Sequence, residues 1–423
     1  MKSSKMLPVF RMLVIGVLSL ACGSYGAGFS ILEQSVSGLG RSLAGMTAET
    51  RDPSAIFFNS AAPAWFEKAE ISLGTHFLHA RAFYDDRGSD GFTGNNGGNM
   101  GGWSYIPNMY VVCPVASGVS LGLGMSATSG TSTSYSPYWI GRYLGVETEI
   151  AVMDLNPVIA WKVREDLSIG VGGLIEYADV TLSQAVQFPI PGSADGQMKM
   201  EGDSLAYGFT LGVLYEPVSG TRLGLGYRSR MTHDLDLNAR VRGVPAILTG
   251  MGLKSASSAE AELKLPSMIN FGIQQDLGEK WTVMADVSWT EWSVMDELTV
   301  EFDRPVLGSK GDTLKMKWDD CWRFAVGCEY KWTEAFTLRC GLAYDQTPVS
   351  SKDSRSVRLP DADRYWASAG IGYKLAENIR LDLAYTHIFF ETVELVNKTP
   401  AGTLRGKVTG DADIISAAIT YMF

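Results

Sequence analysis

From Glu70 onward, hydrophobic and polar residues alternate along the chain with a period of two. Such alternation is typical of β-strands that turn one face to an apolar medium and the other to a polar one. Counting the alternating stretches gives 14 predicted strands. They cover residues 70–84, 103–115, 119–129, 148–164, 167–186, 198–216, 222–240, 259–276, 281–302, 313–332, 337–349, 361–375, 379–396 and 405–423.

The connections between these stretches are of two kinds. Most of those after odd-numbered strands run to about ten residues or more, which is the length of surface loops. Those after even-numbered strands are short, and they comprise residues 116–118, 165–166, 217–221, 278–280, 333–336 and 376–378. Short turns at one end and long loops at the other indicate an outer-membrane β-barrel, with both ends of the barrel domain on the short-turn side.

The two faces of each predicted strand differ in polarity. In the stretch 321–332, Trp322, Phe324 and Val326 share one side, whereas Arg323 and Glu329 share the other. A lysine or arginine that faces lipid at the midplane costs about 2–4 kcal/mol, so the polar side must face the lumen. The same parity places further arginines in the lumen, namely Arg228, Arg339 and Arg380. A soluble sandwich would instead bury the aromatic side.

The first 69 residues lack the strand pattern. Residues 1–26 combine basic residues, an apolar run and small residues, which predicts a secretory signal peptide cleaved before Ala27. A lipoprotein signal ending at Cys22 is disfavoured because Ser19 stands where a leucine is usual. Residues 27–69 are too apolar for a solvated tail, so we expect them to fill the lumen as an N-terminal hatch, or plug. The alternative is a periplasmic extension.

The C-terminal residues predict how the barrel, residues 70–423, closes. Ala417, Ile419, Tyr421 and Phe423 lie on one side of the last strand, which ends on an aromatic residue. A half-apolar edge strand must be paired, and in a bacterial outer membrane pairing closes the barrel. We therefore expect outer-membrane lipid and, through this strand, the barrel assembly machinery as partners. The expected fold class is all-β, a 14-stranded antiparallel transmembrane barrel with an N-terminal hatch.

Net charge and cysteine content bear on which partners, metals and cofactors the protein could bind. A net charge of −10 argues against a nucleic-acid partner, which would require a basic stripe. Cys328 and Cys340 fall on the same face of neighbouring strands, so a cross-strand disulfide is possible, although a role as small apolar fillers is favoured. No histidine accompanies the cysteines at zinc-ligand spacing, and we expect neither a metal nor a cofactor.

Catalytic motifs are also missing from the sequence. It has four histidines, none in a Gly-x-Ser-x-Gly setting, and His233-Asp234 has no paired serine that would act as a nucleophile. We therefore expect that the protein is not an enzyme.

Several short motifs occur in a characteristic order. They are Ala27-Gly28-Phe29, Ser37-Gly38-Leu39-Gly40-Arg41, Gly226-Tyr227-Arg228-Ser229-Arg230, His233-Asp234-Leu235-Asp236, Trp322-Arg323-Phe324-Ala325-Val326-Gly327, Arg339-Cys340-Gly341, Asp345-Gln346-Thr347-Pro348-Val349 and Leu359-Pro360-Asp361-Ala362-Asp363-Arg364-Tyr365-Trp366. In this order the chain resembles the FadL and TodX family of outer-membrane long-chain fatty acid and hydrophobic-compound transporters.

The resemblance implies passive carriage of a hydrophobic molecule without ATP. The ligand would be captured between extracellular loops and passed to a pocket touched by the first hatch residues. A hatch movement and an inward kink in the third strand would then open a lateral exit through the wall. Phe29 matches the family's early hatch aromatic, and Asn59-Ser60-Ala61 stands in place of its Asn-Pro-Ala motif, with Pro63 slightly downstream.

These considerations define the candidate site. For ligand binding we expect Phe29 and Ile31 in the hatch and the apolar loop residues Ile247, Leu248, Trp139 and Tyr143, because exposed apolar loops usually mark binding surfaces. Arg228 is the candidate partner for a carboxylate headgroup. For gating we expect Asn59, Ser60 and Ala61, with a strand kink at Gly122 and Gly124, where the alternative is lumen space for the hatch.

Three other functions remain open at this stage. The same scaffold could carry aromatic hydrocarbons in place of fatty acids. An adhesin or purely structural barrel would depend on its loops and not on a hatch, and a passive porin for polar solutes is disfavoured by the aromatic loops.

Overall fold

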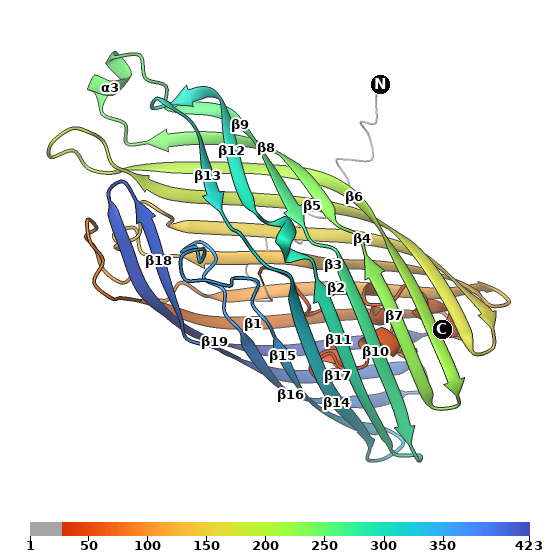
Figure 1. Ribbon diagram of the computed structural model, residues 1–423. Helices are drawn as coiled ribbons and strands as arrows, with labels where there is room; N and C mark the ends of the chain where they lie inside the picture. Colours follow the sequence, from red (N-terminus) through yellow and green to blue (C-terminus); the bar gives the residue numbers. More distant parts are fainter. Residues whose placement is uncertain (1–27) are drawn as a thin grey trace, which may run out of the picture.

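The computed structural model describes residues 28–423, so the expected signal peptide and the expected mature start at Ala27 lie outside it. Nineteen strands in the described part form a single antiparallel sheet (Figure 1). The sheet closes on itself because β1 pairs with β2 on one side and with β19 on the other, in a register that joins Glu70 to Met422. The predicted antiparallel barrel is confirmed.

The nineteen strands make 14 staves, where a stave is one complete crossing of the wall. Nine staves are single strands: β1 (Glu70–Asp86), β2 (Trp103–Ala116), β3 (Val119–Ser134), β4 (Glu147–Arg164), β5 (Leu167–Val186), β6 (Gly196–Val218), β15 (Phe336–Asp345), β16 (Arg364–Ala376) and β19 (Gly402–Met422). Five are broken in two: β7 (Thr221–Arg228) with β8 (Met231–Arg242), β9 (Ala256–Leu265) with β10 (Met268–Leu277), β11 (Trp281–Thr290) with β12 (Glu297–Val306), β13 (Ser309–Lys315) with β14 (Cys321–Lys331), and β17 (Ile379–Phe390) with β18 (Val393–Thr399).

The wall has the polarity that the sequence predicts. On β14, Trp322, Phe324 and Val326 are exposed on the outside, whereas Arg323 and Glu329 are buried in the lumen. Large apolar side chains are likewise exposed on the other staves, as a lipid-facing band requires. No helix among residues 28–423 is long and apolar enough to cross a membrane.

The expectation of a longer loop is wrong at two connections, where the structure has tight turns. The chain turns between β12 and β13 through Leu307 and Gly308 alone, and β18 and β19 are joined as tightly. Both residues of the first turn have positive φ angles, which is the geometry of a two-residue hairpin. Both hairpins lie at the end of the barrel that carries α3 (Figure 1).

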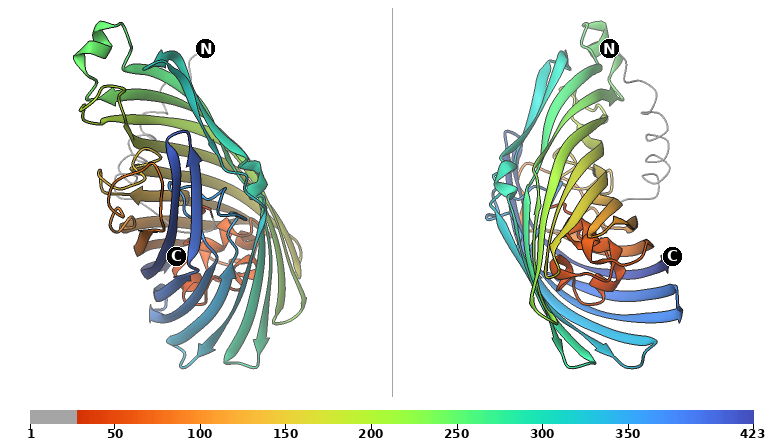
Figure 2. Two further views of the ribbon diagram at one scale, coloured as in Figure 1. Left: turned by 60° about the vertical axis from the view of Figure 1, so that its left-hand side comes forward. Right: turned by 90° about the vertical axis from the view of Figure 1, so that its right-hand side faces the viewer.

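Residues 28–69 precede the first strand and lie inside the barrel (Figure 2). We call them the hatch. They form the short helices α2 (Val36–Leu39), η1 (Met46–Ala48), η2 (Pro53–Phe57) and η3 (Ala62–Trp65). Helix α2 contacts β16, β17 and β19, η1 contacts β7 and β10, and η3 contacts β3, β4 and β5. The hatch therefore touches the wall on several sides of the lumen.

Two further short helices lie outside the hatch. Helix α3 (Ala246–Gly250) lies at the tip of the connection from β8 to β9 (Figure 1), and η4 (Trp292–Val294) separates β11 from β12. Most of the apolar interior divides into two large clusters. One joins the middle of the hatch to the surrounding wall, and the other lines the long-loop half of the barrel and includes Phe29.

Candidate functional site

Phe29 is held between two indole rings. Its ring centroid lies 5.0 Å from that of Trp292 and 5.9 Å from that of Trp318, and the side chain has no exposed surface. The preceding Gly28 has a φ of 64°, and a Cβ added there would lie within 3 Å of both indoles. Trp292 and Trp318 both come from interruptions between strands, so the breaks in two neighbouring staves build this aromatic clamp.

The residues that follow Gly28 add a short strand to β3. The Gly130 amide donates to the Phe29 carbonyl at 2.7 Å, and the Ile31 amide donates to the Thr128 carbonyl at 2.9 Å. Ser30 and Ser129 form the antiparallel bridge between these two bonds.

This added strand occupies an edge of β3 that its neighbour leaves free. The ladder between β2 and β3 begins at the short-turn end and stops at Asn108 and Ser126. On its other side β3 pairs with β4 along its whole length, with a register shift between Ala127 and Ser129. The wall is therefore interrupted between β2 and β3 where the first described residues pair.

An apolar cavity lies against Phe29 on the side of β4 and β5, and we call it the Phe29 cavity. It is lined by Phe29, Thr148, Ile150, Leu182, Met200, Leu263, Met295, Leu298, Val300, Asp312, Leu314, Met316, Arg358 and Leu359. Its volume is about 40 Å³, room for only a few water molecules. An alkyl chain could enter only if a lining group such as Phe29 moved.

Arg358 supplies positive charge at this cavity. It belongs to the loop between β15 and β16, and within residues 28–423 its hydrogen bonds go to uncharged oxygens, among them those of Thr148, Ser183 and Gln184. Burial lowers the pKa of Arg358 to about 10, with Asp312 acting in the opposite direction. The guanidinium stays charged at neutral pH.

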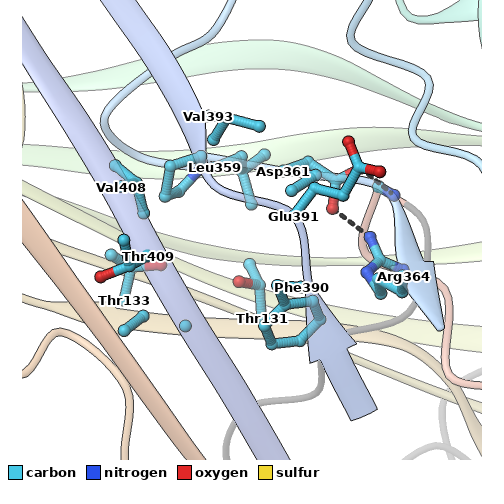
Figure 3. A pocket seen from close by; sticks show the side chains of 15 residues that line it. Thr131, Thr133, Leu359, Asp361, Arg364, Phe390, Glu391, Val393, Val408 and Thr409 are labelled. Atoms are coloured by element: carbon cyan, nitrogen blue, oxygen red, sulfur yellow. Dashed lines mark hydrogen bonds and ion pairs between the residues drawn. The ribbon is translucent and has the colours of Figure 1, made fainter. Parts of the chain in front are cut away.

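A second cavity lies on the other side of Leu359 (Figure 3), and we call it the Thr131 cavity. It is more polar, and residues of β3, β17 and β19 face one another across it. Its lining comprises Gly28, Ala82, Thr131, Thr133, Leu359, Pro360, Asp361, Ala362, Arg364, Phe390, Glu391, Val393, Val408, Thr409 and Gly410. Asp361 accepts a bond of 3.2 Å from the Gly28 amide and forms an ion pair with Arg364. Leu359 and the first described residues thus separate the two cavities.

Arg228 does not line either cavity. It forms an ion pair with Asp154 and lies 3.9 Å from Glu176, which also contacts His233 at 3.1 Å. On its other side it stacks on the ring of Phe57 in the hatch. Its charge is already neutralised by these carboxylates.

The expected capture residues lie apart from one another. Trp139 is fully buried and stacks on Tyr135 at 3.8 Å, so its ring supports its own loop. Tyr143 donates to Asp195 in the neighbouring loop. On α3, Ile247 is exposed and Leu248 packs into the cluster that contains Phe29, whereas Trp139 belongs to a different cluster.

The expected gating motif, Asn59-Ser60-Ala61, is attached to the wall by hydrogen bonds. The Asn59 amide donates to the carbonyls of Thr47 and Val213, and Ser60 donates to Thr210 at 2.6 Å. The wall makes room for this motif with glycines, because a Cβ at Gly170 would lie 2.0 Å from the Ser60 carbonyl oxygen. The Ala61 carbonyl oxygen accepts a bond from Ser168 on the same strand.

The irregularity of β3 is not where the sequence suggested. Gly122 and Gly124 pair regularly with both neighbours, and a Cβ at Gly122 would lie 2.9 Å from Ile56 of the hatch. These glycines give the hatch space. The register shift lies further along, between Ala127 and Ser129 and directly before Gly130.

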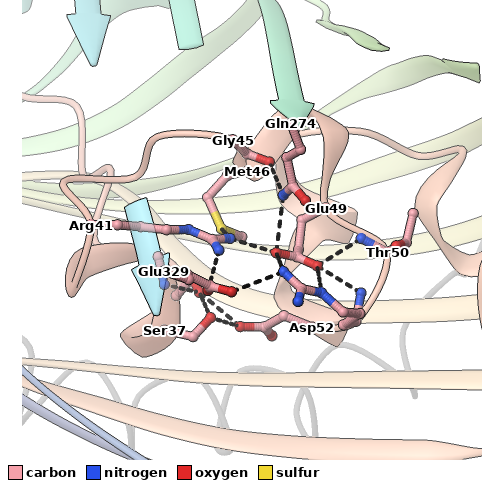
Figure 4. A network of polar contacts seen from close by, with 12 residues as sticks. Ser37, Arg41, Gly45, Met46, Glu49, Thr50, Asp52, Gln274 and Glu329 are labelled. Atoms are coloured by element: carbon pink, nitrogen blue, oxygen red, sulfur yellow. Dashed lines mark hydrogen bonds and ion pairs between the residues drawn. The ribbon is translucent and has the colours of Figure 1, made fainter. Parts of the chain in front are cut away.

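A charged network holds the middle of the hatch against β14 and β15 (Figure 4). Arg41 pairs with Glu49 at 2.6 Å and with Glu329 of the wall. Arg51 also reaches Glu329, at 3.0 Å, and Arg339 completes the contact from β15 at 2.9 Å. A buried charge left without its partner is strongly destabilising, so the network fixes the hatch body.

Sequence reasoning missed three groups at this site, namely Trp292, Trp318 and Arg358. The two tryptophans lie inside the predicted strands 281–302 and 313–332, whose breaks the alternation did not reveal, and Arg358 directly precedes the Leu359-Pro360-Asp361 motif in a loop without periodicity. The sequence carried no signal that would have found them.

The chain matches the family model described as outer membrane protein transport protein (OMPP1/FadL/TodX) over residues 17–423. It is 26% identical to the long-chain fatty acid transport protein of Escherichia coli O6:H1, over 454 aligned residues and the whole of both chains. The crystal structure of a Pseudomonas aeruginosa FadL homologue has a TM-score of 0.87 at 26% identity, covering 93% of this chain and 99% of the homologue.

The toluene transporter TbuX of Ralstonia pickettii has the same fold. Its TM-score is 0.66 at 19% identity, over 92% of this chain and 100% of that one. At that identity the likeness concerns the fold alone.

Proposed function

Because the chain belongs to the OMPP1/FadL/TodX family of outer-membrane transporters of hydrophobic compounds, we propose that its own cargo is a long-chain fatty acid or a similar carboxylate amphiphile. The protein is a transporter and not an enzyme, and it resides in the bacterial outer membrane. We propose that it acts as a gated diffusion channel, in which cargo moves down its own gradient without ATP.

The Phe29 cavity is the observation that carries this proposal. Apart from Thr148, Asp312 and Arg358 its lining is aliphatic and aromatic, which suits an alkyl chain, because each CH₂ transferred out of water contributes about 0.8 kcal/mol. Arg358 lies at the same cavity with uncharged partners, and a carboxylate would complete its coordination. An aromatic hydrocarbon would leave that charge unused.

Arg358 replaces Arg228 as our candidate for the headgroup. Arg228 is neutralised by Asp154 and Glu176, so a ligand carboxylate would have to compete with them. Hydrogen bonds to charged groups contribute about 1.5–3 kcal/mol, and a second carboxylate at an occupied cation gains little of that.

The proposed route passes from the loops to the gap beside β3. Exposed Ile247 on α3 and Met251 directly after it offer a first apolar contact. Cargo then enters the Phe29 cavity and displaces Phe29 from its indole clamp, because the cavity is too small otherwise. This releases Ile31 and its neighbours from β3, and the gap between β2 and β3 beyond Ser126 becomes a lateral exit into the membrane.

The test compares ligand affinities of the purified protein and its Arg358→Gln variant, read by the change in intrinsic tryptophan fluorescence, to which Trp292 and Trp318 beside the cavity contribute. We expect palmitate to bind the variant about 10- to 100-fold more weakly, which corresponds to loss of a charged hydrogen bond of roughly 1.5–3 kcal/mol. Toluene should bind both proteins equally. Arg358→Lys keeps the charge and should recover part of the palmitate affinity.

Two results would overturn the proposal. Unchanged palmitate affinity in Arg358→Gln would remove this residue from the site. Tight toluene binding with no measurable palmitate binding would favour the alternative cargo, an aromatic hydrocarbon.

A further inference from the structure

Cys328 on β14 and Cys340 on β15 are direct partners across the antiparallel ladder. Their sulfur atoms lie 3.4 Å apart on the outer face of the wall. Directly opposed residues in an antiparallel pair have Cα atoms about 4.5–5.5 Å apart, which falls within the range of about 4.4–6.8 Å that disulfides span. The two thiols can therefore be joined by side-chain rotation with no movement of the strands.

The other two cysteines of residues 28–423 have no such partner. Cys113 on β2 pairs with Leu121 across its ladder, and Cys321 is buried at the start of β14 opposite Thr290. They provide internal controls, because both experience the same compartment without a neighbouring sulfur. A pairing limited to Cys328 and Cys340 would thus reflect geometry and not general oxidation.

The inner side of the same ladder position carries the hatch. Glu329 and Arg339 are the next pair along the ladder and face the lumen, where they pair with each other and Glu329 binds Arg41. On the other side of the cysteine pair, where Gly341 pairs with Gly327, a Cβ added at Gly341 would lie 2.2 Å from the Arg41 backbone. The cysteine pair therefore lies on the outer face of β14 and β15 at the level where the hatch contacts their inner face.

The register of β14 and β15 places the charged side chains of both strands in the lumen. A slip of one residue would turn Glu329 and Arg339 to the lipid and the apolar residues to the lumen. A covalent bond between the adjacent pair would exclude that slip. It would also close a loop over residues 329–339 and oppose separation of the two strands.

We propose that Cys328 and Cys340 form a cross-strand disulfide in the mature protein. One thiolate attacks the disulfide of a periplasmic dithiol oxidoreductase and displaces one of its sulfurs as a thiolate. The second cysteine then attacks the mixed disulfide, releasing the oxidoreductase as a dithiol. Two electrons and two protons pass to the oxidant, which fits a chain that matures outside the reducing cytoplasm.

The test traps the thiols in living cells. Cells that produce the full chain are quenched in acid, denatured, and treated with N-ethylmaleimide without reductant, and the purified protein is digested and analysed by mass spectrometry. We expect the peptides that contain Cys328 and Cys340 to be recovered joined to each other, whereas Cys113 and Cys321 carry the label. Reduction before labelling should yield all four labelled.

Variants and strains complete the design. In Cys328→Ser, Cys340 should become fully labelled, and in cells that lack the periplasmic oxidoreductase both should be labelled in the native sequence. Full labelling of Cys328 and Cys340 in acid-quenched normal cells, equal to that of Cys113, would overturn the proposal. Pairing of either cysteine with Cys113 or Cys321 would overturn it as well.

Discussion

Glu33 is a charged residue in an environment that does not support charge. Its side chain is fully buried in the hatch, and neither carboxylate oxygen has a hydrogen-bond partner elsewhere in the described chain. Burial raises the pKa of Glu33 to about 7, although Arg323 and Arg364 oppose that shift and Asp345 adds to it. The folded protein therefore holds a proton on this residue that the unfolded chain releases at lower pH.

The sign of the pH dependence follows from that difference. A carboxyl whose pKa is raised by folding contributes most to stability below its unfolded pKa of 4.5, and that contribution is lost as pH rises through about 7. Glu33→Gln should therefore raise the free energy of unfolding at pH 8 by an amount on the order of 3 kcal/mol, and much less at pH 5. The measurement is the melting temperature in detergent at the two pH values. The exposed hatch residue Glu67 provides the control variant, Glu67→Gln, which should show no such difference. An equal effect of Glu33→Gln at both pH values would contradict this explanation.

Individual lumen residues could be predicted from parity, whereas residues of the binding site could not. The inward arginines Arg323, Arg339 and Arg380 are confirmed because a membrane strand allows a charge one orientation only. Trp292 and Arg358 follow no such rule, since they lie at a break and in a loop whose positions depend on the closed barrel. Their proximity to Phe29 is a product of tertiary structure.

At the scale of the element, β5 presents two glycines with opposite roles. Gly170 faces the lumen, where a Cβ would lie 2.0 Å from the Ser60 carbonyl oxygen, whereas Gly173 faces outward with nothing nearer than 4.0 Å. Gly170→Ala should displace the gating motif and destabilise the protein by about 1–3 kcal/mol, the usual cost of overpacking. We expect faster cleavage of the hatch by an added protease and greater leakage of a large antibiotic into cells.

Gly173→Ala is the matched control on the same strand. It adds the same methyl group on the lipid-facing side and should leave protease resistance and leakage unchanged. If Gly170→Ala behaved like Gly173→Ala, the motif would not be docked on β5 in the way that the structure places it.

The staves themselves were the easiest elements to predict. Each crosses the membrane, so its two faces differ in polarity along the whole crossing, and 14 alternating stretches correspond to 14 staves. The breaks within five of them were not predicted. At Pro266, between β9 and β10, the missing amide hydrogen explains the break, but at Trp292 the cause is packing against Phe29.

At the scale of the whole molecule, the hatch has two parts with different attachments. Its body is fixed by charged groups, as between Arg41 and Glu329, and by Ser42, whose hydroxyl lies 2.8 Å from that of Ser368 on β16. Its first described residues are held by one aromatic clamp, two backbone bonds to β3 and the bond from the Gly28 amide to Asp361. We therefore expect the leading segment to move during transport while the body stays in place.

Closure of the wall is what makes this arrangement possible. The ladder between β1 and β19 runs from Glu70 and Met422 to Asp86 and Gly406 without a gap, whereas the ladder between β2 and β3 stops halfway. The sequence predicted the closed barrel because an unpaired strand edge is not tolerated in lipid. It did not predict that the leading hatch segment would pair with β3 where the ladder between β2 and β3 has ended.

The most direct test locks that segment in place. The variant Ser30→Cys/Ser129→Cys, with the four native cysteines of the described chain replaced by serine, joins the bridged pair by a disulfide under oxidising conditions. Ser42→Cys/Ser368→Cys ties the hatch body in the same way and serves as the control. Uptake of labelled palmitate is measured in cells without another such transporter, before and after reduction. We predict that the oxidised first variant is blocked and recovers on reduction, while the control transports throughout. Undiminished uptake through the fully cross-linked first variant would contradict the proposed gate.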